Sequence, residues 1–252
     1  MMKALKAGMA AAGGKTAGKA GARGRRRWLK WIVLGPLLAV LLVQLYFFAM
    51  ICWWTQFNPS STSMMRAQLS SLREKNPNAK LEQVWVPYER ISDNLKRAVI
   101  ASEDANFTEH DGVDWEALEK AYERNNKRHK VIGGGSTITQ QLAKNLFLSG
   151  SRNYLRKGQE LVIAYMLETV MSKQRILEIY LNVVEFGRGV FGAEAAARHY
   201  YRSTAARLDP AQAARLAVML PNPRYYDAHR QTNYLSRRTG VIQRRMNAAD
   251  LP

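Results

Sequence analysis

The feature that most constrains this chain is an uncharged run of 24 residues, WIVLGPLLAVLLVQLYFFAMICWW, from Trp31 to Trp54. As an α-helix such a run is about 36 Å long, which exceeds the roughly 30 Å hydrocarbon core of a bilayer. Tryptophans lie near both ends of the run, where amphipathic rings favour the headgroup level. The run therefore predicts a single transmembrane helix at residues 31–54.

The arm before this helix sets the expected orientation. Residues 1–30 contain nine basic residues and no acidic one, and they are rich in Gly and Ala, so we expect a disordered cytoplasmic arm. The rest of the chain then lies on the outer side of the membrane. A cleaved signal peptide is the alternative, but its apolar core is normally about 7–15 residues and a small-residue cleavage site follows it. The longer run found here, with no clear site, favours an uncleaved anchor.

Charge and cysteine content narrow the function classes. The chain has 38 Lys and Arg against 20 Asp and Glu, a formal net charge of +18, which favours an anionic partner. The densest basic run directly precedes the predicted membrane helix, so a topology signal explains it better than nucleic-acid binding. The single cysteine, Cys52, lies inside the predicted helix, so an intramolecular disulfide is excluded.

The exported part is predicted to be mainly α-helical. Residues 55–80 are polar and rich in Ser and Asn, and we expect a stalk or linker there, with one short helix. A helical domain follows at 81–236, with one short extended stretch in LEQVWVPYERI and no sizeable sheet. Residues 237–252 are expected to form a frayed tail. The predicted N-caps are Ser92, Asp114, Ser172 and Asp209, the last completed by Pro210 and Gln212.

The stretch GGGSTITQQLAKN, residues 133–145, is the first candidate for chemistry. Its glycines permit close backbone approach, and a helix start with free N–H groups suits a phosphate. Helical spacing places Thr137, Gln140, Gln141 and Lys144 on one polar face, while the GxxxxGK[ST] pattern of a P-loop is absent. A phosphate-binding helix start and a merely solvated helix face both fit this stretch.

The stretch SEDANFTEHDG, residues 102–112, crowds acidic residues where an apolar helix ends. A carboxylate such as Glu103, held beside an apolar side chain such as Phe107, would have a raised pKa and could act as a general base. Capping acids with a structural histidine are the alternative. His110 has no second histidine at ligand spacing, so we expect no zinc site.

The stretch RNYLRKGQE, residues 152–160, is the third candidate. The basic residues Arg152, Arg156 and Lys157 could neutralise a diphosphate through charge-assisted hydrogen bonds. The alternative is an i, i+4 ion pair between Arg156 and Glu160. On the next apolar helix, packing and buried hydrogen bonding are expected of the polar residues Lys173, Glu178, Tyr180 and Asn182.

Four segments, SEDANFTEHDG, GGSTITQQLAKN, RKGQE and KQRILEIYLN, occur in the order and approximate spacing of the peptidoglycan glycosyltransferases of glycosyltransferase family 51. The chain resembles this family over about residues 85–226, and it has no S-x-x-K or K-T-G motif of a transpeptidase domain. It therefore resembles the monofunctional, biosynthetic transglycosylases of Gram-negative bacteria. The resemblance implies a mainly α-helical, lysozyme-like, two-lobed glycosyltransferase domain, periplasmic and anchored in the inner membrane by one N-terminal transmembrane helix.

The resemblance also implies a reaction. Glu103 would take the proton from the 4-hydroxyl of lipid II N-acetylglucosamine, whose oxygen attacks the anomeric carbon of the donor strand with inversion while undecaprenyl diphosphate leaves. Glu160 would be a second essential carboxylate that orients basic partners or a divalent ion. The substrate-binding residues implied by the family are Asp104, Ser136, Gln140, Gln141, Lys144, Arg152, Arg156 and Lys157.

No cofactor is required in this interpretation, although a divalent cation, Mg or Mn, could enhance activity. The expected partners are lipid II, the polyprenyl-diphosphate-linked glycan strand, membrane lipids and proteins of cell division or cell-wall synthesis, but not nucleic acid. Two other classes stay open. One is a lysozyme-like hydrolase that cuts glycan strands with Glu103 and a second carboxylate, and the other is a non-catalytic membrane-tethered scaffold that binds glycan.

Overall fold

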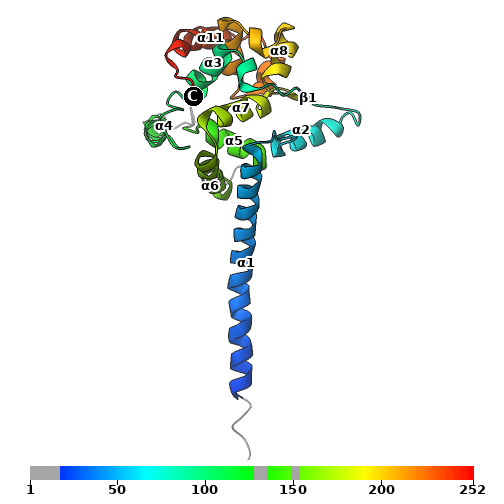
Figure 1. The fold of residues 1–252 in the computed structure, drawn as a ribbon, viewed down its shortest axis with the longest axis vertical. Helices are drawn as coiled ribbons and strands as arrows, with labels where there is room; N and C mark the ends of the chain where they lie inside the picture. Colours follow the sequence, from blue (N-terminus) through cyan, green and yellow to red (C-terminus); the bar gives the residue numbers. More distant parts are fainter. Residues whose placement is uncertain (1–17, 128–134, 149–153) are drawn as a thin grey trace, which may run out of the picture. The chain divides into compact units, whose positions relative to one another are not determined.

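The computed structural model describes residues 18–127, 135–148 and 154–252 (Figure 1). The chain forms two compact units, one ending at Tyr46 and the other beginning at Phe47. The α-helices are α1 Gly18–Trp54, α2 Ser63–Arg73, α3 Asp93–Glu103, α4 Trp115–Lys127, α5 Ile138–Phe147, α6 Tyr154–Val170, α7 Lys173–Val183, α8 Ala193–Tyr201, α9 Pro210–Met219, α10 Pro223–Ala228 and α11 Asn233–Arg245. The strands are β1 Glu82–Gln83, β2 Glu185–Gly187 and β3 Val190–Phe191, and the short 3-10 helices are η1 Tyr88–Arg90, η2 Ala205–Arg207 and η3 Met246–Ala248.

The first unit is the greater part of α1. Within this helix, the 21 residues of Leu34–Trp54 have a mean hydropathy of 2.2, and they are the one segment of the described chain long and apolar enough to cross a membrane. Most of the large apolar side chains between Leu34 and Tyr46 are exposed, as a lipid-facing helix requires. The candidate span lies within the anchor predicted at 31–54, but α1 begins at Gly18, so residues 18–30 of the arm expected to be disordered are helical.

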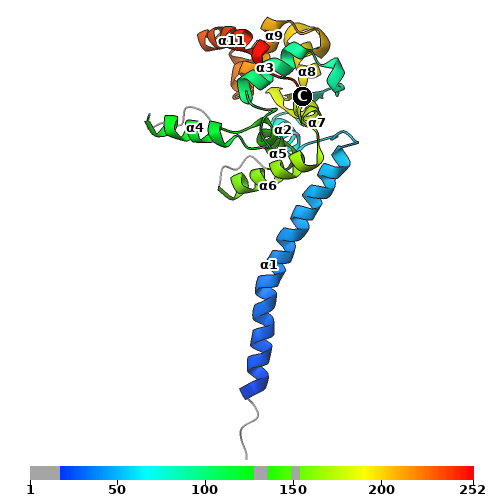
Figure 2. The ribbon, with the colours of Figure 1, turned by 60° about the vertical axis from the view of Figure 1, so that its left-hand side comes forward.

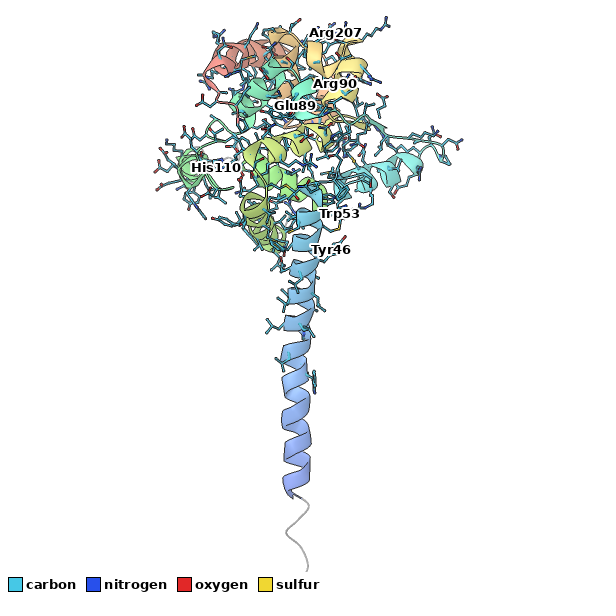
Figure 3. The ribbon with its side chains drawn as sticks, in the orientation of Figure 1. Tyr46, Trp53, Glu89, Arg90, His110 and Arg207 are labelled. Carbon is cyan, nitrogen blue, oxygen red and sulfur yellow. The ribbon has the colours of Figure 1, made fainter. Side chains whose placement is uncertain are left out.

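The last two turns of α1 belong to the second unit. The rings of Phe47 and Trp54 pack against Phe147 of α5, with centroids 4.8 and 5.1 Å apart. The Arg175 guanidinium of α7 donates to the carbonyl oxygen of Trp54 at 2.9 and 3.1 Å. The side chain of the preceding residue, Trp53, is about half exposed (Figure 3). The helical domain therefore begins inside α1 rather than after a free linker.

Two groups of helices make up the second unit. One group is centred on α5, which packs against α2, α6 and α7, and the other on α9, which packs against α3 and α11. Figures 1 and 2 both place α4, α5 and α6 at one end of the unit and α3, α9 and α11 at the other. The predicted mainly α-helical fold is confirmed.

A small three-stranded sheet lies in the same unit. Its strand order is β1-β3-β2, with β1 parallel and β2 antiparallel to β3. The chain leaves β3 through Gly192, whose φ of +83° favours glycine, and a Cβ there would lie 2.6 Å from the carbonyl oxygen of Asn182. The short extended stretch expected near residue 82 therefore exists as one edge of this sheet.

The four N-capping residues predicted from the sequence are confirmed. In each case a side-chain oxygen accepts a hydrogen bond from a backbone N–H of the first turn, which satisfies one of the donors left open at a helix start. Asp209 also forms the predicted capping box with Gln212, directly before Pro210. The four capping residues are Ser92, Asp114, Ser172 and Asp209.

The structure differs from expectation at both ends of the predicted domain. The segment 55–80, expected to be a stalk or linker with one short helix, does contain a helix, α2, but this helix belongs to the domain: its Met65 is buried in the hydrophobic core, and it packs against α5. The segment 237–252, expected to fray, contains most of α11 and η3, with Ile242 and Met246 fully buried. Leu235, Ile242 and Met246 recur at helical spacing, and the short polar runs between them hid this apolar face.

The buried side-chain amide of Asn182 links α7 to the backbone that follows β1. Asn182 on α7 is fully buried, and its Oδ1 accepts from the N–H of Val86 at 2.9 Å. Its Nδ2 donates to the carbonyl oxygens of Val86, at 2.9 Å, and Glu178, at 2.8 Å. The side chain thus replaces a strand neighbour for the backbone that follows β1.

Asn182→Ala should therefore destabilise the fold by about 2–4 kcal/mol, because it leaves two buried backbone groups of Val86 without partners. Chemical denaturation of the detergent-solubilised full chain, followed by far-UV circular dichroism, measures the change. Asn76→Ala is the matched control, because Asn76 bonds only an exposed turn N–H. A loss for Asn182→Ala as small as that of the control would contradict this role.

Candidate active site

Glu103 occupies the last position of α3, where the chain turns into the 104–112 loop. Its Oε2 accepts from Gln141 Nε2 at 2.9 Å, and its Oε1 accepts from Ser102 Oγ at 3.3 Å. Burial raises the pKa of the Glu103 carboxyl, and the hydrogen bonds together with the charges of Lys144 and Arg238 oppose that rise only in part. A hollow of about 190 Å³ opens beside it, bounded by the loop and by residues 135–137. A desolvated carboxylate facing open space is a candidate general base.

Asp104, the next residue, has a different environment. One carboxylate oxygen lies 2.9 Å from His110 Nε2, and the other accepts from the backbone N–H of Ile138 at 2.9 Å. The second contact places a negative charge at the N-terminus of α5, where the helix dipole favours it. Asp104, predicted to bind substrate, thus uses both oxygens to join the loop to α5.

His110 completes this join. Its Nδ1 accepts from the backbone N–H of Gly112 at 3.2 Å, so in the neutral ring the hydrogen is on Nε2 and is donated to Asp104. Gly112 has a φ of +85°, and its carbonyl oxygen accepts from Thr137 Oγ1 at 2.6 Å. In the 102–112 segment, His110 therefore has a structural role, while Glu103 remains the candidate for the general base.

A second cluster brings the glycine-rich stretch and α6 together. Lys157 Nζ donates to Ser136 Oγ at 3.0 Å and to Gln140 Oε1 at 2.8 Å. The same ammonium lies 3.2 Å from Glu160 Oε2, and Arg156 pairs with the other oxygen of Glu160. Glu160 is only 4% exposed, so the two cations hold a nearly buried carboxylate. The i, i+4 pair considered for Arg156 and Glu160 is present.

Lys144 of α5 lies within electrostatic range of both clusters. Burial lowers the pKa of its ammonium, Glu160 and Glu103 raise it, and Arg156 and Lys157 lower it. The ammonium makes no hydrogen bond to any residue that the structure describes. A partly desolvated cation without such a bond is suited to contact an anionic ligand.

Two predicted features lie outside the described residues: Arg152, and the first two glycines of GGGSTITQQLAKN. Within the described ranges, the third glycine borders the hollow beside Glu103, and Thr137 caps α5 by accepting from the N–H of Gln140 at 3.2 Å. Those ranges contain no group of three or more His, Cys, Asp or Glu side chains that could hold a metal ion. Glu160 forms ion pairs with Arg156 and Lys157.

Three side chains near the site make contacts whose partners the sequence did not identify. Buried hydrogen bonding was expected of Tyr180, and its OH donates to Gln141 Oε1 at 2.9 Å. Lys173 Nζ bonds the carbonyl oxygen of His110 and pairs with Glu168 at 2.9 Å, which supports the 104–112 loop. Arg238, in the predicted tail, lies close enough to Glu103 to favour its ionised form. Each contact depends on packing between helices that local sequence patterns do not reveal.

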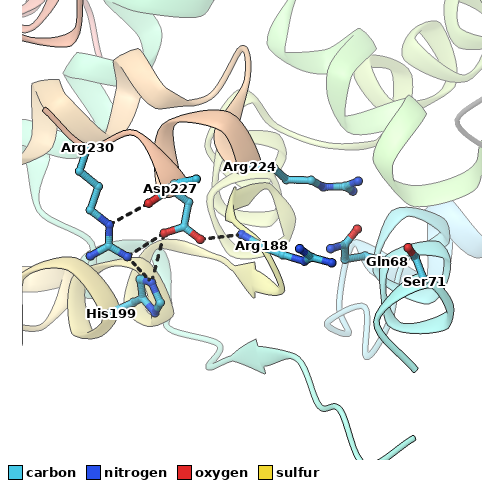
Figure 4. A pocket seen from close by; sticks show the side chains of 8 residues that line it. Gln68, Ser71, Arg188, His199, Arg224, Asp227 and Arg230 are labelled. Carbon is cyan, nitrogen blue, oxygen red and sulfur yellow. Dashed lines mark hydrogen bonds and ion pairs between the residues drawn. The ribbon is translucent and has the colours of Figure 1, made fainter. Parts of the chain in front are cut away.

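A separate polar hollow of about 470 Å³ lies over the turn between β2 and β3, beside α8 and α10 (Figure 4). It is lined by basic side chains, and three of them, Arg224, Arg230 and His199, lie beside carboxylates. Arg224 bonds both oxygens of Glu185 at 2.8 and 2.9 Å, and Arg230 lies 2.8 Å from Asp227. These pairs tie α10 to β2 and brace the turn that follows α10, so the hollow serves first as a structural junction.

A mainly helical domain that places a desolvated carboxylate near a group of cations is suited to remove a proton from one substrate while holding an anionic group of another. The sequence pattern of the family described as Transglycosylase matches residues 69–247. The chain belongs to this transglycosylase family. The matched range starts within α2 and ends within η3, so it includes segments expected to be linker and tail.

Relatives cover nearly the whole chain. The biosynthetic peptidoglycan transglycosylase of Janthinobacterium sp. (strain Marseille) is 68% identical over 227 residues, 90% of this chain and 98% of the relative. That of Bordetella pertussis (strain Tohama I) is 59% identical over 235 residues, 90% of this chain and 97% of the relative. That of Methylobacillus flagellatus is 59% identical over 221 residues, 86% of this chain and 96% of the relative.

The raised pKa of Glu103 predicts a stability effect that is independent of activity. A carboxyl whose pKa is higher in the folded state than in the unfolded state loses stability as the pH rises through the folded-state pKa. Glu103→Gln cannot ionise, so it should melt at a higher temperature than the wild type at pH 7. The difference should shrink as the pH falls toward the unfolded value of about 4.3.

Thermal melting of the detergent-solubilised full chain between pH 4.5 and pH 8 measures this difference. Glu109→Gln is the control, because Glu109 is an exposed carboxylate on the same loop and should behave like the wild type. A Glu103→Gln variant that is equally or less stable than the wild type at pH 7 would contradict a desolvated Glu103.

Proposed function

We propose that this peptidoglycan transglycosylase polymerises glycan strands, transferring the growing strand from undecaprenyl diphosphate to the 4-hydroxyl of lipid II N-acetylglucosamine. The protein is a glycosyltransferase, as its family membership and its biosynthetic peptidoglycan transglycosylase relatives indicate. The observation that carries the detailed proposal is that α5 contacts both the carboxylate of Glu103 and the cation cluster of α6. A desolvated carboxylate bonds Gln141, and a cation cluster bonds Gln140, one residue earlier on the same helix.

Glu103 is the general base in this proposal. It removes the proton of the 4-hydroxyl as that oxygen forms a bond to the anomeric carbon of the donor. The bond from that carbon to the diphosphate oxygen breaks, its electron pair leaves with the diphosphate, and attack from the opposite face inverts the configuration. The burial that raises the pKa of Glu103 makes the carboxylate a stronger base, and the Gln141 hydrogen bond keeps the ionised form accessible.

The diphosphate requires charge neutralisation more than protonation, because it is already a good leaving group. Lys144, Arg156 and Lys157 are the proposed partners of its oxygens, with Arg152 expected in the same role. Glu160 holds Arg156 and Lys157 in place. Ser136 and Gln140 bond Lys157 and thereby set the direction of its ammonium. Asp104 supports the site by fixing the Glu103 loop to α5.

The same proposal gives the protein its location and partners. The substrate is linked to a membrane lipid, and α1 is long and apolar enough to anchor the enzyme beside it. The basic arm before the helix favours a cytoplasmic N-terminus, so the catalytic domain would lie in the periplasm at the inner membrane. Membrane lipids and proteins of cell division or cell-wall synthesis are the remaining proposed partners.

A hydrolase that cuts glycan strands is the second function class that the site could serve. Such an enzyme needs a second carboxylate that activates water or attacks the sugar. Both oxygens of Glu160 are bound by cations, and both oxygens of Asp104 are bound by His110 and Ile138. Neither is a ready base or nucleophile, which favours transfer over hydrolysis. Purified protein given preformed glycan strands should release no fragments.

Glu103→Gln should abolish polymerisation of lipid II, with a rate loss of at least about 100-fold, because general-base catalysis contributes that much or more. Gel analysis of labelled glycan polymer made by the full chain in detergent provides the measurement. Glu109→Gln, on the same loop, should polymerise at the wild-type rate. Full activity of Glu103→Gln would refute the base, and absence of polymer from the wild type under varied detergent and metal conditions would refute transfer.

Lys144→Met should lower kcat/KM for lipid II by about 10–100-fold, because it removes one charge-assisted hydrogen bond to the diphosphate. The side chains have similar volume, so the fold should be retained. Lys75→Met is the matched control, since Lys75 is exposed in the turn that follows α2. Equal kinetics for the two variants would exclude Lys144 from the diphosphate site.

A further inference from the structure

A chain of two hydrogen bonds connects the buried core to the proposed base. Tyr180 lies on α7 with no exposed surface, and its hydroxyl donates to Gln141 Oε1 at 2.9 Å. Gln141 Nε2 donates in turn to Glu103 Oε2 at 2.9 Å. The three residues come from α7, α5 and α3, so the two hydrogen bonds connect three different helices.

The direction of each bond follows from the chemistry of the groups. A carboxylate can only accept, so the amide group that faces Glu103 must be the NH2 group. The opposite end of the amide, Oε1, then requires a donor, and Tyr180 supplies one. Burial raises the pKa of the Tyr180 hydroxyl well above its usual value, and the charges of Glu103 and Asp104 raise it further, so the hydroxyl keeps its proton at every working pH.

The reversed amide is disfavoured at both ends. Turning Gln141 over would point Oε1 at Glu103, where two acceptors repel each other. It would also leave the Tyr180 proton facing the amide NH2 group. A tyrosine that always donates therefore selects one of the two amide orientations, whereas a phenylalanine of the same shape would select neither.

We propose that Tyr180 is a positioning residue for the transfer reaction: it holds the Gln141 amide with its NH2 group toward Glu103, so that Glu103 stays a hydrogen-bonded carboxylate at the working pH. This inference rests on the proposed role of Glu103 as base. It gives α7, whose polar residues were expected only to pack and hydrogen-bond within the core, a direct link to the chemistry.

Other charged groups near Glu103 also affect its ionisation, independently of Tyr180. Lys144 of α5 and Arg238 of α11 favour the carboxylate through their charge. Asp104, at the end of α3, keeps both oxygens on His110 and Ile138. None of these contacts passes through Tyr180, so removing its hydroxyl should change only the Gln141 hydrogen bond to the base.

The test is the pH profile of kcat for lipid II polymerisation by the full chain carrying Tyr180→Phe. The weakened Gln141 bond should raise the proton affinity of Glu103, so the acid limb should move about 0.5–1 pH unit toward higher pH. On the alkaline side of that limb, kcat should stay within about threefold of the wild type. Tyr201→Phe is the matched control, because Tyr201 OH bonds the Gln212 carbonyl, at 3.4 Å, away from Glu103.

A Tyr180→Phe protein with an unmoved acid limb, or with an equal loss of kcat at every pH, overturns the inference and leaves Tyr180 a packing residue. Gln141→Leu provides a second route should Tyr180→Phe fail to fold. Its acid limb should move in the same direction, and an unmoved limb there also overturns the inference. Glu103→Gln separates the two proposals: if that variant polymerises normally, the base assignment itself fails, whatever the pH profile of Tyr180→Phe.

Discussion

The carboxylate of Asp104 makes the contact on which the rest of the site depends. It bonds His110 in its own loop and the first free N–H of α5, so a single side chain fixes the end of α3 against the start of α5. Glu103 sits on one side of this join, and the polar face of α5 on the other. Together with the hydrogen bond from Gln141 to Glu103, the join keeps the proposed base close to the cations of α5 and α6. Lys173 adds a second brace by bonding the His110 carbonyl from α7.

The arrangement also explains the composition of α5. Its apolar side chains, Ile138, Leu142 and Leu146, are buried, while its polar face presents two glutamines rather than the Glu and Lys of a solvated helix. A glutamine amide has both a donor and an acceptor end, so Gln141 can link a hydroxyl to a carboxylate. Gln140 uses its oxygen to hold an ammonium. The neutral amide of Gln141 thus bonds the proposed base and that of Gln140 bonds the cation cluster, and neither amide adds a charge that would shift the pKa of its partner.

Local features of the site and fold were predictable from sequence, and features made by packing were not. The N-caps Ser92, Ser172 and Asp209 follow from side chains that bond their own first turn, so short-range patterns identify them. Motif resemblance selected most of the candidate residues that the structure brings together around α5. The bridging role of Asp104 and the Tyr180 contact depend on how α5 meets the loop and α7, which no spacing encodes. The tail was mispredicted because its few apolar residues, although at helical spacing, are separated by polar runs, and their burial depends on the packing of α11 against α3 and α9.

The most direct test of this division of roles is an experimental structure of the full chain bound to a non-reactive, diphosphate-containing analogue of the lipid-linked donor. The diphosphate oxygens should lie within hydrogen-bond distance of Lys144, Arg156 or Lys157. The donor sugar should then extend toward the hollow beside Glu103. A diphosphate bound elsewhere, for example beside Arg188 and Arg224 in the second hollow, would contradict the assignment of the cation cluster to the leaving group.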